Sequence, residues 1–290
     1  MKVVIRTVAV IGAGTMGLGI AQVCASSGFT TLLFDVNKEQ LISAVEVIIK
    51  NLAQSVAKGK CTEEQKRDTL SRIHTVSEIT ALKADLVIEA AVEKLEIKQE
   101  LFSQLEKINE GKTILATNTS SISVTQIFSA LRDPVRAIGL HFFNPADRMK
   151  LVEIISGAHT DPALVQTMKD FCQQLRKTCV LAKDSPGFIV NRVARHFYVE
   201  SLKLLEEKTA GVPAIDALLR SAGFKMGPFE LMDLIGVDTN LAVTKSVYRG
   251  FQQDPKLKPS RIQQQLVDEG HYGRKTGRGF YEYSQKQKSI

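Results

Sequence analysis

The chain of 290 residues is poor in several residue types, and each scarcity narrows the class of protein. Tryptophan is absent, and aromatic residues make up only 6% of the chain. The net charge is +7, but lysine and arginine form no long block and no basic stripe with interleaved aromatic residues, which disfavours nucleic acid as a partner. A multiply charged anionic small molecule accounts for the excess of cations at least as well. The hydrophobic and charged fractions, 44% and 24%, are those of a globular protein, and the length suits two domains.

Cysteine is also scarce. The four cysteines are Cys24, Cys61, Cys172 and Cys179, and they include no C-x-x-C pair and no metal-ligand spacing. We therefore expect reduced thiols, a cytoplasmic location and no bound metal. We also expect no targeting segment ahead of the first strand. The sequence contains no internal repeat and no low-complexity segment.

Charge is missing from one long stretch, residues 7–34, which follows Lys2 and Arg6 and so imitates a signal peptide or a membrane span. Five glycines interrupt this stretch, and Gln22, Ser26 and Ser27 dilute its apolar character. The stretch then ends in a second strand-like run. We therefore reject the membrane interpretation.

The first part of the chain has the pattern of an α/β domain. Residues 7–11 form a continuous apolar run, which is typical of a strand buried on both faces of a parallel sheet. A helix over 15–27 and a strand over 30–35 follow. Asn37 with Gln40, and Thr62 with Gln65, predict two capped helices that form a hairpin inserted before the third strand. Further strands are expected at residues 73–76, 85–90, 113–117, 136–141 and 150–156, with a helix over 94–110.

The second part is helical in its periodicity from residue 162 onward, with a hinge at residues 183–187. Helices are expected over residues 190–205, 213–222, 229–235, 239–249 and 260–268, and a flexible loop over 273–279. The fold class is therefore α/β, with a Rossmann-type dinucleotide-binding domain in residues 1–184 that contains the inserted helical hairpin. A smaller all-α domain follows in residues 185–290.

A glycine-rich loop joins the first strand to the first helix. The pattern is Gly12-x-Gly14-x-x-Gly17, with Thr15 and Met16 inside it. Such a loop brings backbone N–H groups to a pyrophosphate at the start of a helix, where the helix dipole favours an anion. Asp35, at the end of the second strand, would bind ribose hydroxyls and repel a 2′-phosphate. The sequence therefore predicts NAD as the cofactor.

A second feature is His141, at the end of an apolar strand that stops at Asn144-Pro145. Ligands of such folds bind at the carboxyl ends of the strands, so this imidazole is expected to face the cofactor. Glu153 lies in the next strand, on its apolar side, and a buried carboxylate needs a partner. A His–Glu pair beside a nicotinamide indicates hydride transfer coupled to proton transfer. A purely structural pair is the alternative.

Short polar side chains follow another strand end, at Asn118 and Ser120, and Asn191 follows the hinge at the start of a helix. From the pattern alone these residues are as well explained by helix caps as by a role in the site.

Taken together and in order, these motifs resemble the 3-hydroxyacyl-CoA dehydrogenases, and the length and single-function layout are similar to the bacterial 3-hydroxybutyryl-CoA enzymes. The resemblance covers nearly the whole chain. It rests on residues 12–17, 35, 118–121, 141–145, 150–153, 184–192, 227–236 and 275–281. It implies reversible, NAD-dependent oxidation of (S)-3-hydroxyacyl-CoA, with an acyl-CoA partner, a role in fatty acid metabolism and a homodimer formed through the helical domain.

The resemblance also implies residue roles. His141 would act as general base or acid, Glu153 would hold it, and Ser120 and Asn191 would bind the substrate oxygen. Lys58, on the inserted hairpin, would meet coenzyme A, whose phosphates suit a lysine. The cofactor contacts implied are Gly12, Gly14, Thr15, Met16, Gly17, Asp35, Glu93, Lys98, Asn118, Asn144 and Lys275.

Two other functions remain open at this point. A dehydrogenase of a free hydroxy acid, of the carnitine or gulonate type, would use the same site without coenzyme A. The Phe142-Phe143 pair and the lysines of the hairpin favour the acyl-CoA substrate. The second alternative is a non-catalytic NAD-binding protein, such as a redox sensor or a lens crystallin, in which the same fold lacks turnover.

Overall fold

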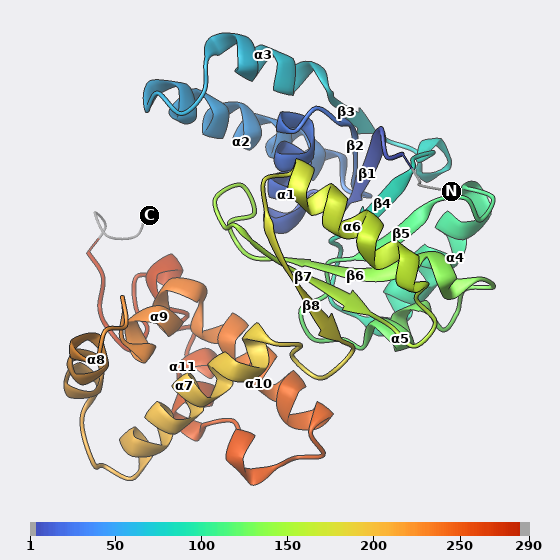
Figure 1. Ribbon diagram of the computed structural model, residues 1–290. Helices are drawn as coiled ribbons and strands as arrows, with labels where there is room; N and C mark the ends of the chain where they lie inside the picture. Colours follow the sequence, from blue (N-terminus) through green and yellow to red (C-terminus); the bar gives the residue numbers. More distant parts are fainter. Residues whose placement is uncertain (1–3, 285–290) are drawn as a thin grey trace. The chain divides into compact units, whose positions relative to one another are not determined.

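The computed structural model describes residues 4–284, and the outer ends of both predicted domains, residues 1–3 and 285–290, lie outside the described residues. The chain divides into two compact units between Ser185 and Pro186, and Figure 1 shows an α/β unit and an all-helical unit. Within residues 4–284, no helix is both long enough and apolar enough to cross a membrane.

The first unit is built on an eight-stranded sheet with the order β3-β2-β1-β4-β5-β6-β7-β8. The strands from β3 to β6 in that order are mutually parallel, β7 runs antiparallel to β6, and β8 is parallel to β7. The strand bounds are β1 Thr7–Ile11, β2 Thr30–Phe34, β3 Ile73–Val76, β4 Leu86–Glu89, β5 Ile114–Thr117, β6 Ala137–Phe142, β7 Leu151–Ser156 and β8 Thr178–Lys183.

Helices cover both faces of this sheet: α1 and α6 lie over one face, and α4 and α5 at the other (Figure 1). The bounds are α1 Thr15–Ser26, α2 Lys38–Ala57, α3 Glu63–Ser71, α4 Leu95–Ile108, α5 Val124–Phe128 and α6 Pro162–Gln174, with short 3-10 turns at Ile79–Ala81 and Pro134–Arg136. Because strand residues alternate between faces, Leu86 and Ile88 of β4 join the core under α1 and α6, whereas Glu89 points to the opposite face.

The inserted hairpin is confirmed. In the chain, the helices α2 and α3 come between β2 and β3. In space they lie beyond the β3 edge of the sheet (Figure 1). The Asn37 side chain accepts hydrogen bonds from the backbone N–H groups of Glu39 and Gln40. Thr62 and Gln65 form a reciprocal capping box at the start of α3. Both predicted starts are therefore correct, because these side chains supply acceptors to N–H groups that have no partner within the helix.

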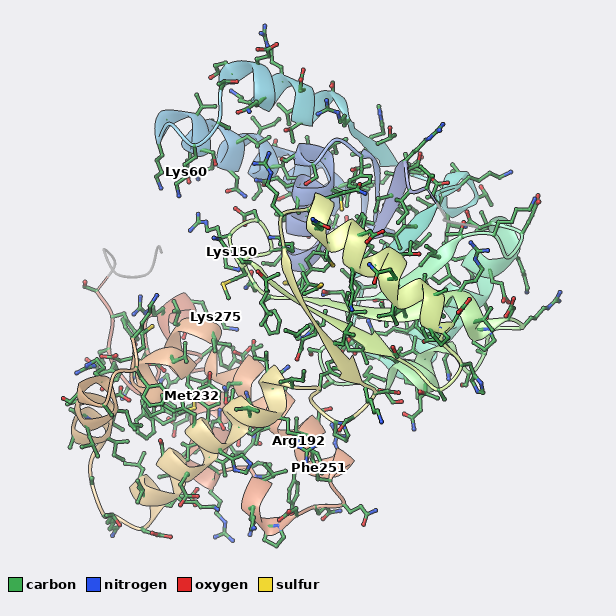
Figure 2. All side chains as sticks on the ribbon, in the orientation of Figure 1. Lys60, Lys150, Arg192, Met232, Phe251 and Lys275 are labelled. Atoms are coloured by element: carbon green, nitrogen blue, oxygen red, sulfur yellow. The ribbon has the colours of Figure 1, made fainter. Side chains whose placement is uncertain are left out.

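The second unit is all-helical, with Met232 in its core (Figure 2). Its helices are α7 Val190–Glu206, α8 Val212–Ser221, α9 Pro228–Ile235, α10 Val237–Gly250 and α11 Arg261–Asp268, with a 3-10 turn at Pro255–Leu257. The loop predicted to be flexible contains a further 3-10 turn, Arg274–Thr276. The segment after this loop is fixed to α9, because buried Asp233 accepts hydrogen bonds from the backbone N–H groups of Phe280 and Tyr281.

One prediction about the first unit was wrong. The last strand was expected to be β7, with only helices beyond residue 162, but β8 returns to the sheet and pairs in parallel with β7. This strand lies at the edge of the sheet and its residues are exposed or half-buried. Its apolar run, residues 179–182, is only four residues long and has no pattern that separates a strand from the end of a helical segment. Its identity as a strand comes from the backbone of β7, which supplies the hydrogen-bonding partners.

Candidate active site

The glycine loop at the end of β1 uses each glycine for a different physical reason. Gly12 has a φ of +95°, and a Cβ there would lie 2.6 Å from the Ala90 carbonyl oxygen. A Cβ on Gly17 would lie 1.7 Å from the carbonyl oxygen of Gly12, so only glycine lets α1 approach β1 this closely. Gly14 differs, because a Cβ there would meet nothing within 4 Å. The fold therefore does not require glycine at position 14, and the open space beside it is where a ligand's phosphate could approach the backbone.

The start of α1 suits an anion. Gly14 is the N-cap residue, no side chain caps the helix, and its first turn contains no acidic residue. Exposed Thr15 and half-buried Met16 follow in that turn. Backbone N–H groups without a capping side chain, together with the positive end of the helix dipole, favour a phosphate.

Asp35 stands beside this loop, just after β2. Its carboxylate accepts a hydrogen bond from the Ala13 N–H at 2.7 Å and another from the Asn37 N–H at 2.9 Å. These two bonds hold the glycine loop and the start of the hairpin against each other. A carboxylate has about four acceptor positions, so ribose hydroxyls can still bind.

We expect alanine substitutions at Gly14 and Gly17 to act on different properties. Gly17→Ala should lower the free energy of unfolding by about 1–3 kcal/mol, because the added methyl collides with backbone. Gly14→Ala should leave the melting temperature nearly unchanged but weaken NADH binding by roughly tenfold, because the methyl displaces a close backbone–phosphate approach. Thermal melts and NADH fluorescence titrations separate the two effects. Equal loss of stability in both variants would contradict the assignment.

His141 and Glu153 form a buried pair. They are register partners in the antiparallel pairing of β6 with β7, and His141 Nδ1 lies 2.7 Å from Glu153 Oε2. His141 is 6% exposed and Glu153 is fully buried. The ring of Phe143 lies 4.5 Å from that of His141, centroid to centroid. The contact between His141 and Glu153 that the sequence predicted is confirmed. Glu153 binds the imidazole through Nδ1, so the other ring nitrogen, Nε2, is directed away from Glu153.

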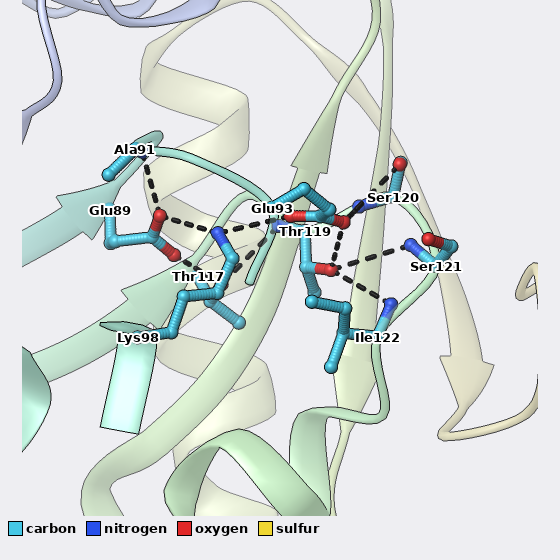
Figure 3. A network of polar contacts seen from close by, with 9 residues as sticks. All are labelled: Glu89, Ala91, Glu93, Lys98, Thr117, Thr119, Ser120, Ser121 and Ile122. Atoms are coloured by element: carbon cyan, nitrogen blue, oxygen red, sulfur yellow. Dashed lines mark hydrogen bonds and ion pairs between the residues drawn. The ribbon is translucent and has the colours of Figure 1, made fainter. Parts of the chain in front are cut away.

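The loop after β5 is held by a network of polar contacts around Glu93 (Figure 3). The Thr119 hydroxyl donates to Glu93 Oε1 at 2.6 Å, the Ser120 N–H donates to the same atom at 3.0 Å, and the Ser120 hydroxyl lies 3.5 Å from it. Burial alone would raise the pKa of Glu93, but the Lys98 charge and these hydrogen bonds together lower it below its ordinary value. Glu93 is therefore an anion that organises the loop bearing Ser120.

Lys98 and Asn118 also have partners within the protein. The Lys98 side chain is 1% exposed, and its ammonium group lies between Glu93 and Glu89. The Asn118 side chain accepts a hydrogen bond from the Phe142 N–H at 2.8 Å, which ties the end of β5 to the end of β6. Both residues thus support the carboxyl edge of the sheet. Glu89 was missed by the sequence analysis, although it also ends an apolar strand.

The remaining predicted residues lie elsewhere. Asn144 is exposed after β6, and Lys58 is exposed at the C-terminal end of α2, close in sequence to Lys60 (Figure 2). In the second unit, α7 begins at Val190, so Asn191 lies inside the first turn and is not the cap that was considered. The Lys275 ammonium pairs with Asp238 at 2.7 Å.

The donor set fits a dinucleotide that carries out hydride chemistry. The uncapped helix start, the open side of Gly14 and the Asp35 carboxylate suit the pyrophosphate and ribose. The His141–Glu153 pair lies on β6 and β7, and β6 is the third strand from β1 in the sheet. The pair and the glycine loop lie at the same edge of the sheet, where the parallel strands have their carboxyl ends. Among residues 4–284, no group of three His, Cys, Asp or Glu side chains is arranged to hold a metal ion.

Two family models match most of the chain. The NAD binding domain of 3-hydroxyacyl-CoA dehydrogenase matches residues 7–185, and the C-terminal domain of the same family matches residues 187–283.

Individual relatives agree with these models. The chain is 48% identical to the 3-hydroxyadipyl-CoA dehydrogenase of Escherichia coli K12, over 100% of its own length but only 62% of that protein. It is 43% identical to the 3-hydroxybutyryl-CoA dehydrogenase of Bradyrhizobium diazoefficiens, over 98% of the chain and 97% of the relative. The solved structure of (S)-3-hydroxybutyryl-CoA dehydrogenase from Ralstonia eutropha has a TM-score of 0.92 and 39% identity, covering 97% of this chain and all of that one.

Proposed function

The chain belongs to the 3-hydroxyacyl-CoA dehydrogenase family, and from this premise we propose that it oxidises (S)-3-hydroxyacyl-CoA reversibly to 3-oxoacyl-CoA with NAD. The observation that carries the proposal is the buried His141–Glu153 pair at the carboxyl edge of a sheet that also bears the glycine loop. A short acyl chain, as in 3-hydroxybutyryl-CoA, is supported by the relatives of that name.

The chemistry assigned to the chain's own residues is proton transfer. In oxidation, His141 Nε2 accepts the proton of the 3-hydroxyl group, while Glu153 holds Nδ1 and stabilises the imidazolium that forms. In reduction, the imidazolium returns the proton. A positioned acid–base group of this kind contributes about 10²–10⁴-fold to the rate. NAD, when bound, supplies the hydride acceptor.

Other residues bind and orient. We assign the substrate oxygen to Ser120 and Asn191, and the phosphates of coenzyme A to Lys58, whose exposed ammonium suits a multiply charged anion. The cofactor is assigned to the glycine loop and Asp35, with Glu93, Lys98, Asn118, Asn144 and Lys275. We propose that residues 1–184 form the domain that binds the cofactor. Residues 185–290 form the domain for substrate binding and dimerisation.

A dicarboxylic substrate is a second candidate, because a relative 48% identical over the whole chain is a 3-hydroxyadipyl-CoA dehydrogenase. Adipyl-CoA derivatives carry a terminal carboxylate that a butyryl chain lacks, so the two substrates differ by one full charge. Comparing kcat/KM for 3-hydroxybutyryl-CoA and 3-hydroxyadipyl-CoA separates them.

The deciding experiment follows the loss of NADH absorbance with acetoacetyl-CoA, with NADPH and free acetoacetate as controls. Rapid oxidation only with NADH and the thioester supports the proposal. Turnover of free acetoacetate alone would move the chain to the hydroxy-acid dehydrogenases. No turnover in any mixture, with NADH still bound, would support a sensor or structural protein.

We also propose a homodimer formed through the second unit. Leu218 near the end of α8 is 68% exposed, and Phe224 just beyond it is 51% exposed, so this part of the second unit offers apolar surface that a partner subunit could cover. Phe224→Ser should therefore lower the dimer fraction measured by light scattering, and the exposed Ile42→Ser of α2 serves as the matched control. A monomeric wild type would rule out the dimer.

The four free thiols support a cytoplasmic location, which tagging of the protein in cells tests.

A further inference from the structure

A buried ion-pair chain lies beside the proposed site, and one of its members, Glu89, has no role in the reaction described above. Lys98 Nζ lies 2.5 Å from Glu89 Oε1 and 3.1 Å from Glu93 Oε2 (Figure 3). Glu89 is completely buried, and Lys98 is 1% exposed. Two carboxylates, one buried and one partly exposed, therefore share one buried ammonium group.

The backbone and β5 hold Glu89 rigidly. Its Oε1 also accepts the N–H of Ala91 at 2.7 Å, and its Oε2 accepts the hydroxyl of Thr117 at 2.7 Å. Glu89 and Thr117 are register partners on adjacent strands, and both side chains point to the face covered by α4. Glu89 is thus an immobile charge built into the sheet.

The chain of contacts leads from this fixed charge to the substrate-binding loop. Glu89 holds the Lys98 ammonium, and Lys98 holds one oxygen of Glu93. The other oxygen of Glu93 accepts from the Thr119 hydroxyl and the Ser120 N–H. Glu93 itself is 38% exposed at its side chain, so it would be mobile without these partners.

Stability alone is a poor explanation for this arrangement. Burying a salt bridge costs desolvation, and replacing a buried pair with apolar side chains of similar size is often neutral or stabilising. A buried ion pair that also fixes an exposed carboxylate has a second purpose, which is geometric. Groups that meet a cofactor and a substrate need supporting contacts of this kind to hold their positions.

We propose that Glu89 is a positioning residue for the dehydrogenase reaction: through Lys98 it fixes Glu93, and through Glu93 it fixes the loop that carries Ser120. This inference rests on the proposed function, because it takes Glu93 as a cofactor contact and Ser120 as a substrate contact. Glu89 touches neither ligand in this scheme. Its effect passes entirely through the ion-pair chain.

The test uses Glu89→Gln and the double variant Glu89→Gln/Lys98→Met. Glutamine keeps the size of Glu89 and can still accept the Ala91 N–H, but it removes the charge that holds Lys98. The double variant leaves no unpaired charge in the buried position. Asp85→Asn is the matched control, because Asp85 binds the backbone N–H groups of Arg6 and Thr7 just ahead of the same strand, at its opposite end.

Three readouts are measured for each variant: the melting temperature, the Kd of NADH by fluorescence, and kcat with acetoacetyl-CoA. We expect Glu89→Gln to raise the Kd of NADH roughly tenfold, as for one lost charge-assisted hydrogen bond, and to lower kcat by about 10²-fold through misplacement of the loop. Glu89→Gln should also lower the melting temperature, because it leaves the buried Lys98 charge unpaired. The double variant should recover the wild-type melting temperature but should recover neither NADH binding nor turnover. Asp85→Asn should leave both binding and turnover near wild type.

Two results would overturn the inference. One is NADH binding and turnover near wild type in Glu89→Gln. The other is recovery of both, together with the melting temperature, in the double variant, since the ion pair would then serve folding only. If Glu89→Gln does not fold, Glu89→Asp takes its place, because it keeps the buried charge and leaves Lys98 intact but shortens the side chain that reaches Lys98. If the wild type binds NADH but turns over no acyl-CoA, the proposed function fails while the NADH titrations still test the positioning of Glu93.

Discussion

Replacing His141 with glutamine should lower kcat by about 10²–10⁴-fold and leave the Kd of NADH almost unchanged. Glutamine can still donate a hydrogen bond to Glu153, so the buried carboxylate keeps a partner and the fold is preserved. The side-chain amide cannot accept a proton at neutral pH, so only the acid–base step is lost. Stopped-flow measurement of NADH oxidation with acetoacetyl-CoA gives kcat, and NADH fluorescence gives the Kd.

The control for this substitution is His159→Gln. His159 is exposed in the loop after β7, so the same chemical change there should leave turnover at the wild-type level. Retention of full turnover by His141→Gln would remove His141 from the mechanism. A parallel loss of NADH binding would instead mean that the substitution had disturbed the sheet.

Replacing Glu153 with glutamine should lower kcat by about 10²–10⁴-fold as well, for a different reason. The amide carries no charge to stabilise the imidazolium, and with its N–H group toward Nδ1 it favours the tautomer that has its proton on Nε2. That tautomer cannot accept the hydroxyl proton. Because Glu153 is fully buried, removing its charge should leave the melting temperature equal to or above that of the wild type.

Two further variants complete the test of Glu153. Glu153→Asp keeps the charge but shortens the side chain, so it should retain more activity than Glu153→Gln. Glu106→Gln is the matched control, because the Glu106 carboxylate accepts hydrogen bonds from the backbone N–H groups of Arg132 and Asp133, and this variant should remain active. A Glu153→Gln enzyme with wild-type kcat would mean that the His141–Glu153 pair is structural, which was the alternative to a catalytic pair.

Local signals in the sequence predicted most elements correctly. The bounds of β1 and β3 and the starts of α2 and α3 agree with the structure, because apolar runs and capping side chains depend on neighbouring residues alone. The edge strand β8 was missed, since its partner β7 is what makes it a strand. The direction of β7, antiparallel to β6, was likewise not specified by any local pattern.

The candidate site shows the same division. His141 and Glu153 were paired from strand alternation and from the need of a buried carboxylate for a partner, and the structure brings them to 2.7 Å. Glu89 was not selected, because a glutamate at the end of an apolar strand carries no motif of its own. Its importance becomes visible only when Lys98, from the following helix, is found against it.

The sequence by itself determined the glycine loop, the inserted hairpin, the helical second part and the pairing of His141 with Glu153, because each depends on residue type and short-range spacing. The tertiary structure alone decided the strand order and the return of β8 to the sheet. It also decided that a side chain would collide with backbone at Gly17 but not at Gly14, and that ion pairs and hydrogen bonds connect Glu89 to Ser120. These features depend on contacts between residues far apart in the chain, whose energies are set by packing and burial rather than by local propensity.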